Sequence, residues 1–333
     1  MTKDYFILHG NCIPVKGATR SIICDLQLGK YKYIPNELYD ILNLSREHSI
    51  TDLEEKFDLS EDGSLFHYFE ALVKSGYGIF TNTPELFPVL DLEFATYSEV
   101  TNAIIDYNST STYNLISVIK QLEGLVCEAV QIRNFDGLNI DILEKISTTF
   151  SESSIPIFEI ILKHDIIVEG RLESILENNS RFRYVIVHSS PVDKSIEIKN
   201  SKVHFTKKSI DSSSHCGQIS SFFFTVNIES FTEALAYNSC LNKKISIDTN
   251  GEIKNCPSFE KSFGIINNTK LVDVLRNLEF KKVWKINKDQ ISTCKDCEFR
   301  YICTDCRAYT KNGGLFDKPQ KCSYNPYIGE WEN

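Results

Sequence analysis

A dense group of cysteines near the C-terminal end constrains what this chain can fold into more than any other feature. Four of them follow one another with the spacing C-x2-C-x5-C-x2-C: Cys294, Cys297, Cys303 and Cys306. Three more flank the group: Cys240, Cys256 and Cys322. Two thiolates separated by two residues can bind one metal centre, because a tight turn points both sulfur atoms the same way. The spacing therefore predicts a metal-binding region, with zinc and iron–sulfur chemistry both open.

Length, charge and cysteine content narrow the class of protein. A chain of 333 residues predicts two or three domains. The formal charge of −9 and the lack of a basic stripe argue against a nucleic-acid partner. No apolar run approaches the ~20 residues of a membrane span, and the run near the N-terminus is too short for a signal peptide. We therefore expect a cytoplasmic protein without a membrane partner, whose eleven cysteines are metal ligands or buried thiols rather than a disulfide framework.

Residues 1–88 predict a small α+β module. Runs rich in aromatic and β-branched residues predict strands at 5–8, 20–26, 30–34 and 79–80. Helices are expected at 36–43, from a capping Thr51 to Phe57, and from Ser64 to Gly76. The layout is that of a winged helix, but the basic recognition helix that DNA binding needs is absent. A small α+β domain of another use stays an alternative.

This layout resembles the PqqD-like RiPP recognition element, a winged helix that binds the leader peptides of ribosomally made, modified peptides. The resemblance implies that an extended leader adds a strand to the small sheet, next to a helix. Backbone pairing would then supply affinity, and side-chain pockets would supply specificity. On this resemblance we expect a precursor or leader peptide as a partner.

Strands and helices alternate between residues 89 and 238. Strands are predicted at 101–107, 127–135, 156–162, 182–188, 202–207 and 222–226, and helices at 113–125, 139–150, 170–178 and 229–237. Alternation of this kind predicts βαβ units around a parallel sheet, built as an open sheet or a partial barrel. The fold class is therefore expected to be α/β.

Side chains that end these strands are candidates to line a crevice, because active sites on such sheets lie at the carboxyl ends of strands. They are Asp106, Arg133, Lys163 and His188. An ordinary polar strand end is the alternative for each. The seven histidines contain no i, i+4 pair, so a histidine-based metal site is not expected.

Residues 240–256 predict a β-hairpin that turns at Asn250-Gly251, a strong type I′ signal. The hairpin would bring Cys240 and Cys256 close together at its open end. A helix is expected to follow at 271–284.

The seven cysteines from Cys240 to Cys322 resemble a SPASM domain, the C-terminal extension of radical SAM peptide maturases that carries auxiliary [4Fe–4S] clusters. The resemblance implies up to two clusters. Its pairing implies one cluster on Cys294, Cys297, Cys303 and Cys322, and another on Cys240, Cys256 and Cys306. The second set is one thiolate short, and the alternatives are Cys216 as fourth ligand or an open site. Cys303 and Cys306 enclose two residues where the family pattern usually has three, which leaves the place of Cys306 open.

The reactive cluster of a radical SAM enzyme is held by C-x3-C-x2-C, and this motif occurs nowhere in the chain. The loop from Asn108 to Tyr113, where the family places the motif, contains no cysteine. The resemblance is therefore to a degenerate, partial radical SAM-like barrel, and we expect neither binding nor cleavage of S-adenosylmethionine. The expected domains are a PqqD-like recognition domain at 1–88, the degenerate barrel at 89–238 and the SPASM domain at 239–333.

A leader-binding module, a barrel without its cluster and a SPASM domain together resemble the SPASM protein of the grasp-with-spasm peptide systems. In these systems such a protein is paired with an ATP-grasp ligase and a short precursor peptide. The resulting hypothesis is a peptide-maturation protein that presents the precursor to its ligase and has no radical chemistry of its own. One alternative is a peptide-binding adaptor in which the cysteines at 294–306 hold Zn²⁺. The other is a redox enzyme that uses the under-ligated cluster.

Overall fold

The computed structural model describes residues 4–59 and 63–332, and the chain divides into two compact units. Unit 1 combines three segments that lie far apart in the sequence: Met1–Phe94, Gln218–Ser239 and Ile286–Asn333. Unit 2 contains Ala95–Gly217 and Cys240–Lys285. The predicted domain limits at 88/89 and 238/239 stay predictions, and the outermost limits, Met1 and Asn333, fall outside the described residues.

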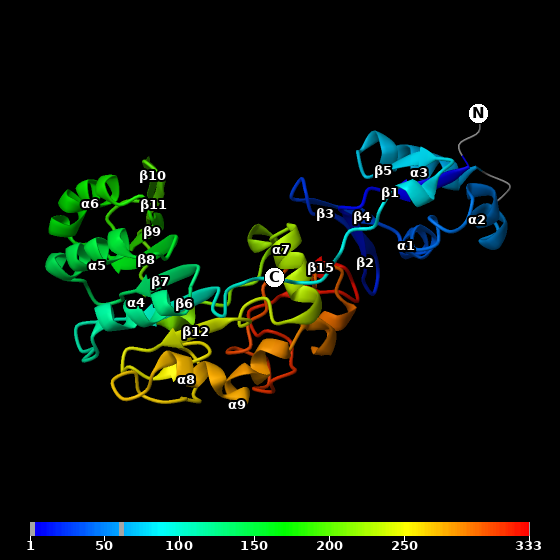
Figure 1. Cartoon of the computed structure of the whole chain (residues 1–333). Coiled ribbons are helices and arrows are strands. Elements are labelled where there is room, and N and C mark those ends of the chain that lie inside the picture. The colour runs from blue at the N-terminus through cyan, green and yellow to red at the C-terminus, as the bar shows by residue number, and fades with distance from the viewer. Residues whose placement is uncertain (1–3, 60–62, 333) are drawn as a thin grey trace. The chain divides into compact units, whose positions relative to one another are not determined.

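The N-terminal segment of unit 1 contains two small sheets and three helices (Figure 1). Its strands are β1 (Tyr5–Leu8), β2 (Cys12–Lys16), β3 (Ser21–Asp25), β4 (Lys30–Ile34) and β5 (Gly78–Thr81). Its helices are α1 (Asn36–Leu42), α2 (Ile50–Lys56), α3 (Ser64–Lys74) and the 3-10 turn η1 (Pro84–Leu86). Strands β2, β3 and β4 form an antiparallel meander, and β1 pairs with β5.

Most of these elements lie where the sequence predicts them, and two details differ. Strand β2 is missing from the prediction, because Pro14 stands in its middle and proline argues against a strand. Helix α2 is capped by Ser49 and not by Thr51. The Ser49 side chain accepts from the backbone N–H of Asp52, whose carboxylate accepts from the N–H of Ser49. A reciprocal capping box therefore starts the helix earlier than predicted.

Unit 2 is organised by one eight-stranded sheet in the order β10-β11-β9-β8-β7-β6-β12-β13. Its strands are β6 (Asn102–Asp106), β7 (Ala129–Arg133), β8 (Ile157–Lys163), β9 (Phe182–His188), β10 (Lys194–Ile198), β11 (Ser201–Phe205), β12 (Lys244–Ile247) and β13 (Ile253–Lys254). Strands β6, β7, β8, β9, β11 and β12 pair in parallel, whereas β10 and β13 run antiparallel at the two edges. The fold class is therefore α/β with a large, mostly parallel sheet, as the sequence predicts.

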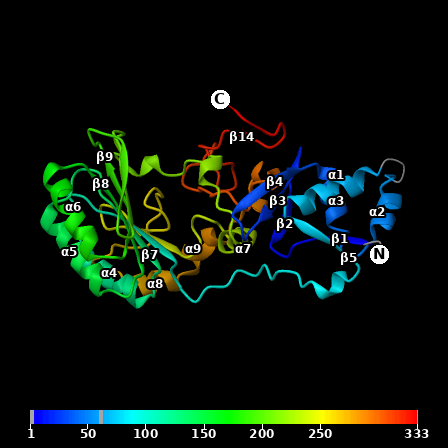
Figure 2. The ribbon, with the colours of Figure 1, turned by 90° about the horizontal axis from the view of Figure 1, so that it is seen from above.

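Helices α4 (Leu115–Gly124), α5 (Ile140–Glu152) and α6 (Ile166–Asn178) lie in a row along one face of this sheet, as two views at right angles show (Figures 1 and 2). Each has an apolar stripe that packs on the strands. Phe150 of α5, for example, stacks on Phe158 of β8 with ring centroids 4.0 Å apart. Both rings are fully buried, as expected for helices covering a parallel sheet.

Two predicted elements differ from the structure, and one strand was not predicted. The expected strand at 222–226 is absent, and the 3-10 turn η3 (Ser221–Phe223) stands there. The expected helix at 271–284 is divided into α8 (Leu271–Arg276), α9 (Leu278–Lys281) and η4 (Lys282–Lys285). Asn277 adopts an extended conformation and its side chain caps α9, so the helix is interrupted there. Strand β10 is missing from the prediction, because its residues are mostly exposed and polar.

The β12–β13 hairpin forms, but its turn is longer than predicted. Asp248 and Glu252 still pair through the backbone, so three residues make the loop instead of two. The Asp248 carboxylate accepts hydrogen bonds from the N–H groups of Asn250 and Glu252, and Gly251 takes a positive φ of 80°. An aspartate at the start of the turn therefore favours the three-residue loop with glycine in the left-handed region.

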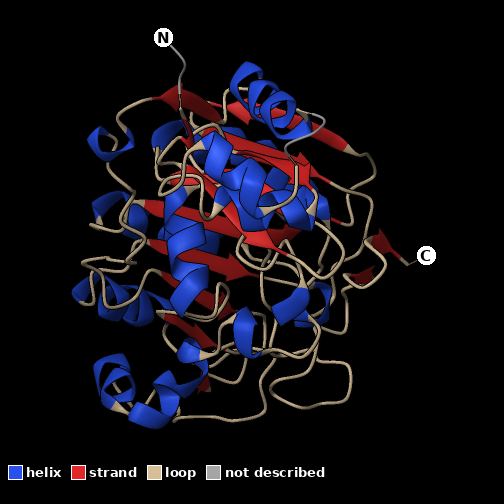
Figure 3. Ribbon diagram, turned by 90° about the vertical axis from the view of Figure 1, so that its right-hand side faces the viewer, coloured by secondary structure: helices blue, strands red, loops and turns tan. Residues whose placement is uncertain are grey.

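The C-terminal part of unit 1, from Ile286, contains little regular structure. It has the 3-10 turns η5 (Lys288–Gln290) and η6 (Cys294–Asp296) and the short pair β14 (Tyr324–Asn325) and β15 (Glu330–Trp331). In Figure 3 the chain end leaves from this pair, next to long stretches of loop. Unit 1 also holds α7 (Ile228–Ala236), while the 3-10 turn η2 (Ser213–His215) belongs to unit 2. No helix within the described ranges is long and apolar enough to cross a membrane.

A buried ion pair at the carboxyl end of the sheet yields a first prediction. The Arg133 guanidinium donates to both Asp106 oxygens at 2.6 and 2.9 Å, and both side chains are about nineteen-twentieths buried. Asp106→Asn leaves the guanidinium buried without a counter-charge, so we expect it to lower the free energy of unfolding by about 3–5 kcal/mol. Urea denaturation measures this.

The matched control is Glu144→Gln, which removes the partner of Arg171 in an exposed ion pair. We expect this change to cost no more than about 1 kcal/mol, because exposed ion pairs contribute little. If both variants lost the same free energy of unfolding, burial would not increase the contribution of the Asp106–Arg133 pair to stability.

Candidate metal centres

Four predicted ligands line one pocket in the C-terminal part of unit 1. They are Cys294, Cys297, Cys303 and Cys322. The remaining lining is mostly apolar or aromatic, with three basic side chains: Ile219, Phe224, Lys288, Thr293, Phe299, Arg300, Lys318, Pro319, Tyr324, Pro326 and Trp331. The pocket therefore collects the thiols of the C-x2-C-x5-C run and the distant Cys322 around a single space.

The backbone around Cys294 explains how the first two thiols reach this pocket. The N–H of Cys297 donates to the carbonyl oxygen of Cys294 at 3.0 Å and closes a one-turn 3-10 helix. Thr293, which precedes it, has a positive φ of 69°. For a β-branched residue this conformation is strained, so the surrounding contacts must hold the turn in place.

The thiols of the pocket are buried in a way that disfavours their charged form. Burial raises the pKa of Cys294 to about 12. It also raises the pKa values of Cys297 and Cys303, although the Lys288 ammonium opposes the rise in both. A thiol must be deprotonated to bind a metal, so a positive metal centre among them would supply the charge that burial otherwise withholds. This donor set of soft, buried sulfur atoms fits zinc or an iron–sulfur cluster.

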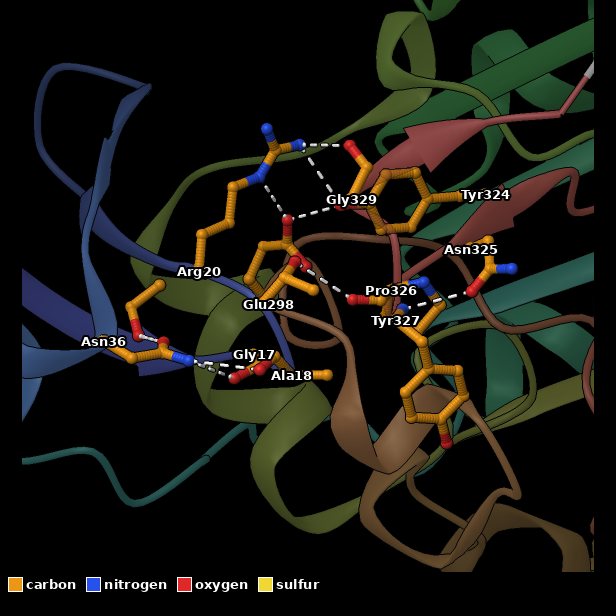
Figure 4. A network of polar contacts seen from close by, with 12 residues as sticks. Gly17, Ala18, Arg20, Asn36, Glu298, Tyr324, Asn325, Pro326, Tyr327 and Gly329 are labelled. Atoms are coloured by element: carbon orange, nitrogen blue, oxygen red, sulfur yellow. Dashed lines mark hydrogen bonds and ion pairs between the residues drawn. The ribbon is translucent and has the colours of Figure 1, made fainter.

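The segment with the cysteines is tied to the N-terminal strands by a buried carboxylate, Glu298. The Arg20 Nε donates to Glu298 at 2.8 Å, and the Tyr324 hydroxyl donates to the same carboxylate oxygen (Figure 4). The second Arg20 nitrogen, Nη2, donates to the Gly329 carbonyl oxygen at 3.0 Å. Thr19 donates to the Pro326 carbonyl oxygen. The β2–β3 turn is therefore fastened to both ends of the cysteine-rich segment.

A second group of cysteines lies within unit 2. Cys240, Cys256 and Cys216 all act electrostatically on the Lys244 ammonium and, against the effect of burial, raise its pKa. The Lys244 Nζ lies 3.4 Å from the Cys240 Sγ. Burial raises the pKa of Cys256 to about 11, and the neighbouring Cys240 adds to the rise. The structure thus brings Cys216 near the two hairpin cysteines. Cys216 and Cys256 also act electrostatically on the Arg133 guanidinium, which lies at the carboxyl end of the sheet.

Cys306 is buried in unit 1 and does not line the pocket described above. All eleven cysteines lie in the described part of the chain, and none forms a disulfide. No three histidine, cysteine or acidic side chains among residues 4–59 and 63–332 are already spaced to hold a single ion. The predicted ligand sets therefore stay predictions.

The strand-end residues proposed as crevice candidates have different surroundings. Asp106 and Arg133 neutralise one another, and Lys163 is exposed. His188 is buried, accepts from the Ile210 N–H at Nδ1 and lies 3.3 Å from the Asn134 carbonyl oxygen at Nε2. Burial lowers its pKa, so the imidazole is neutral and its hydrogen bonds are satisfied. Asp106, Arg133 and His188 therefore have partners within the fold, whereas the Lys163 side chain is exposed.

Two lysines of the first pocket were not among the predicted site residues. Lys288 and Lys318 are both more than nine-tenths buried. The Lys288 Nζ donates to the Thr304 carbonyl oxygen at 3.0 Å, and the Lys318 Nζ donates to the Tyr324 carbonyl oxygen at 2.6 Å. Nothing in the sequence around them separates them from the exposed lysines nearby, because their burial arises from tertiary packing.

Comparison with known protein families identifies part of this region. A family model described as an iron–sulfur cluster-binding domain, SPASM, matches residues 239–298. The matched segment contains Cys240, Cys256, Cys294 and Cys297. A SPASM domain is therefore present in the C-terminal third, as the sequence predicts. A comparison with curated proteins finds no match.

Solved structures of Streptococcus suis SuiB resemble the chain only distantly. SuiB bound to S-adenosylmethionine has 11% sequence identity and a TM-score of 0.34, over 91% of this chain and 96% of that chain. SuiB alone has 10% identity and a TM-score of 0.36 over the same shares. SuiB bound to its precursor peptide SuiA has 12% identity and a TM-score of 0.29, again over 91% and 96%.

The close approach of the β2–β3 turn to Glu298 yields a prediction. A Cβ on Gly17 would lie 2.5 Å from the Arg20 carbonyl oxygen and 2.9 Å from the backbone nitrogen of Glu298. Both neighbours are backbone atoms and have little freedom to move. We expect Gly17→Ala to lower the free energy of unfolding by about 1–3 kcal/mol, measured by urea denaturation.

Gly170→Ala is the control for this change. A Cβ there meets nothing within 4 Å, and the residue lies inside helix α6. We expect it to raise stability by up to about 1 kcal/mol, because alanine favours the helix. A neutral Gly17→Ala would mean that the turn does not press against Glu298.

Proposed function

We propose that this protein binds iron–sulfur clusters and takes part in the maturation of a ribosomally made peptide. The observation that carries the proposal is the pocket lined by Cys294, Cys297, Cys303 and Cys322. Two of these cysteines lie inside the segment matched by the iron–sulfur cluster-binding family. Four cysteine thiolates are the usual ligands of a [4Fe–4S] cluster.

On this proposal Cys294, Cys297, Cys303 and Cys322 hold one [4Fe–4S] cluster. A second cluster is proposed on Cys240 and Cys256, with Cys216 as a further ligand in unit 2, and the place of Cys306 in it stays a prediction. The proximity of Cys216 to Cys240 and Cys256 in unit 2 supports the choice of Cys216. A bound cluster supplies electron transfer or a Lewis-acidic iron, while the chain supplies thiolates, basic side chains and a mostly apolar enclosure.

The N-terminal segment is the proposed peptide-binding module. Strand β4 is an edge of the β2–β3–β4 sheet, so its outer backbone groups are available to an added strand. The expected leader peptide would pair along Lys30–Ile34 in an extended conformation. The strand's alternate side chains then offer the contacts that select the sequence of the leader.

The proposed partner is an ATP-grasp ligase that forms the new bond in the bound precursor. The chain lacks C-x3-C-x2-C, and residues 108–112 in the loop after β6 are all Asn, Ser or Thr. Thr110 donates to Asn108 within this loop, and Ser109 donates to Asp136 in the loop after β7. We therefore propose that no cleavage of S-adenosylmethionine takes place here, and that the protein presents the precursor in the cytoplasm without radical chemistry of its own.

Metal and sulfide content tests the cluster assignment. We expect anaerobically purified protein to be brown and to contain iron and acid-labile sulfide. Cys303→Ala is expected to lower the iron content by about four atoms per chain, because one cluster loses a ligand. The control is Cys127→Ala, which removes a buried thiol from the core of unit 2. A colourless protein rich in zinc would contradict the proposal and favour the zinc-stabilised adaptor.

A reconstituted ligation tests the role in maturation. A candidate precursor peptide and an ATP-grasp ligase are incubated with ATP, with and without the cluster-loaded chain. We expect faster product formation with the chain, and loss of the gain when the leader is removed from the precursor. Ligase turnover that does not respond to the chain would contradict the presenting role and leave the cluster assignment in place.

A further inference from the structure

The charges around the pocket of unit 1 are all of one sign. Its charged lining residues are Lys288, Arg300 and Lys318, and none of its lining residues, all of which are described, is acidic. Arg300 is neutralised by Asp289, which accepts from its Nε at 2.9 Å. The two lysines are different, because neither forms an ion pair with a carboxylate anywhere in residues 4–59 and 63–332.

Buried carboxylates close to the pocket are already neutralised by other groups. Glu298 is bound by Arg20 and Tyr324. Asp305 lies 2.7 Å from the Arg307 guanidinium and accepts from the Asn238 side chain. The oxygen atoms that accept hydrogen bonds from Lys288 and Lys318 belong to neutral carbonyl groups, those of Thr304 and Tyr324. Asp305 also acts electrostatically on the Lys288 ammonium, but in the described ranges neither of the two ammonium groups has a carboxylate within ion-pair distance.

A buried ammonium without a counter-charge is costly unless an anion lies close by. A cluster bound by four thiolates carries net negative charge, and reduction adds one electron to it. Cations at its edge therefore favour the reduced state more than the oxidised one. Net charge and hydrogen bonds to the sulfur atoms are among the main determinants of the reduction potential of such clusters.

We propose that Lys288 and Lys318 act on the cluster of Cys294, Cys297, Cys303 and Cys322 as buried counter-charges and raise its reduction potential. This inference rests on the proposed function, because it requires a cluster in the pocket. Lys288 acts from the side of Cys303, next to the Thr304 carbonyl oxygen that holds its Nζ. Lys318 lines the same pocket, and its Nζ is held by the Tyr324 carbonyl oxygen. Both are positioning residues and bind no iron.

The experiment is a redox titration of the loaded full-length chain, followed by EPR of the reduced cluster. Lys288→Met and Lys318→Met keep side chains of similar length and remove the charge. We expect each to lower the equilibrium constant for reduction at least tenfold, a shift of about 59 mV to more negative potential for a one-electron couple. Lys288→Arg keeps the charge and is expected to stay near the wild-type potential.

Lys295→Met is the matched control. Lys295 lies between Cys294 and Cys297 in the sequence, but its side chain is exposed, so solvent screens its charge. We expect its potential to equal that of the wild type. The inference would be overturned if Lys295→Met shifted the reduction potential as much as Lys288→Met and Lys318→Met do. It would also be overturned if the last two variants bound the cluster with an unchanged potential, or if the wild-type cluster could not be reduced.

Iron and sulfide content separates this failure from failure of the proposed function. If the wild-type protein contains no iron, the proposed function itself is contradicted. If one of the two methionine variants does not bind the cluster, the reduction potential of the other variant tests the inference. If neither loads but Lys288→Arg and Lys318→Arg do, the charges are required to hold the cluster in place, and the claim about its potential is wrong.

Discussion

The buried Glu298 carboxylate is the interaction on which the cysteine-rich segment depends. It lies between two predicted ligands, Cys297 and Cys303, in a stretch with little regular secondary structure. A carboxylate with a fully buried side chain needs compensation, and here Arg20 and Tyr324 provide it. Arg20 is 278 residues away in the sequence, so the carboxylate joins the two ends of the chain into one unit. Loops that would otherwise have little to pack on are thereby held beside the β2–β3 turn.

The proposed peptide-binding strand, β4, packs directly against a residue that lines the cysteine pocket. The rings of Tyr31 and Tyr33 on β4 lie 5.6 and 6.0 Å from the ring of Phe299. Phe299 lines the pocket and follows Glu298 directly. A leader that pairs along β4 would press on residues that pack against the pocket lining. On the proposed function, peptide binding and the environment of the cluster are therefore coupled through aromatic packing within one unit.

Local patterns predicted most elements of unit 2, because these elements depend on periodicity. The grouping of Cys294, Cys297, Cys303 and Cys322 came instead from the resemblance to a SPASM domain, since Cys322 lies far from the other three in the sequence. Strand β10 escaped prediction because it is an exposed edge with polar side chains. The discontinuous unit 1 escaped it because contacts such as Arg20–Glu298 carry no local signal. The burial of Lys288 and Lys318 beside the thiols also arises from tertiary packing, so the sequence does not distinguish them from exposed lysines. The cysteines that line the pocket were thus predictable from the sequence, whereas the electrostatics of the pocket were not.

The two groups of cysteines differ in surroundings, and this difference suits them to different roles. In unit 1 the thiols lie in a mostly apolar pocket with Lys288 and Lys318, where a cluster would be shielded from solvent. In unit 2 Cys216 is exposed, and Cys240 and Cys256 are only partly buried. A shielded cluster with four protein ligands stabilises a loop-rich segment and offers no free coordination position. The cluster proposed at Cys240 and Cys256 includes the exposed Cys216, so solvent or a bound peptide can reach it more easily. If either proposed cluster contacts the precursor, exposure therefore favours the one at Cys240 and Cys256.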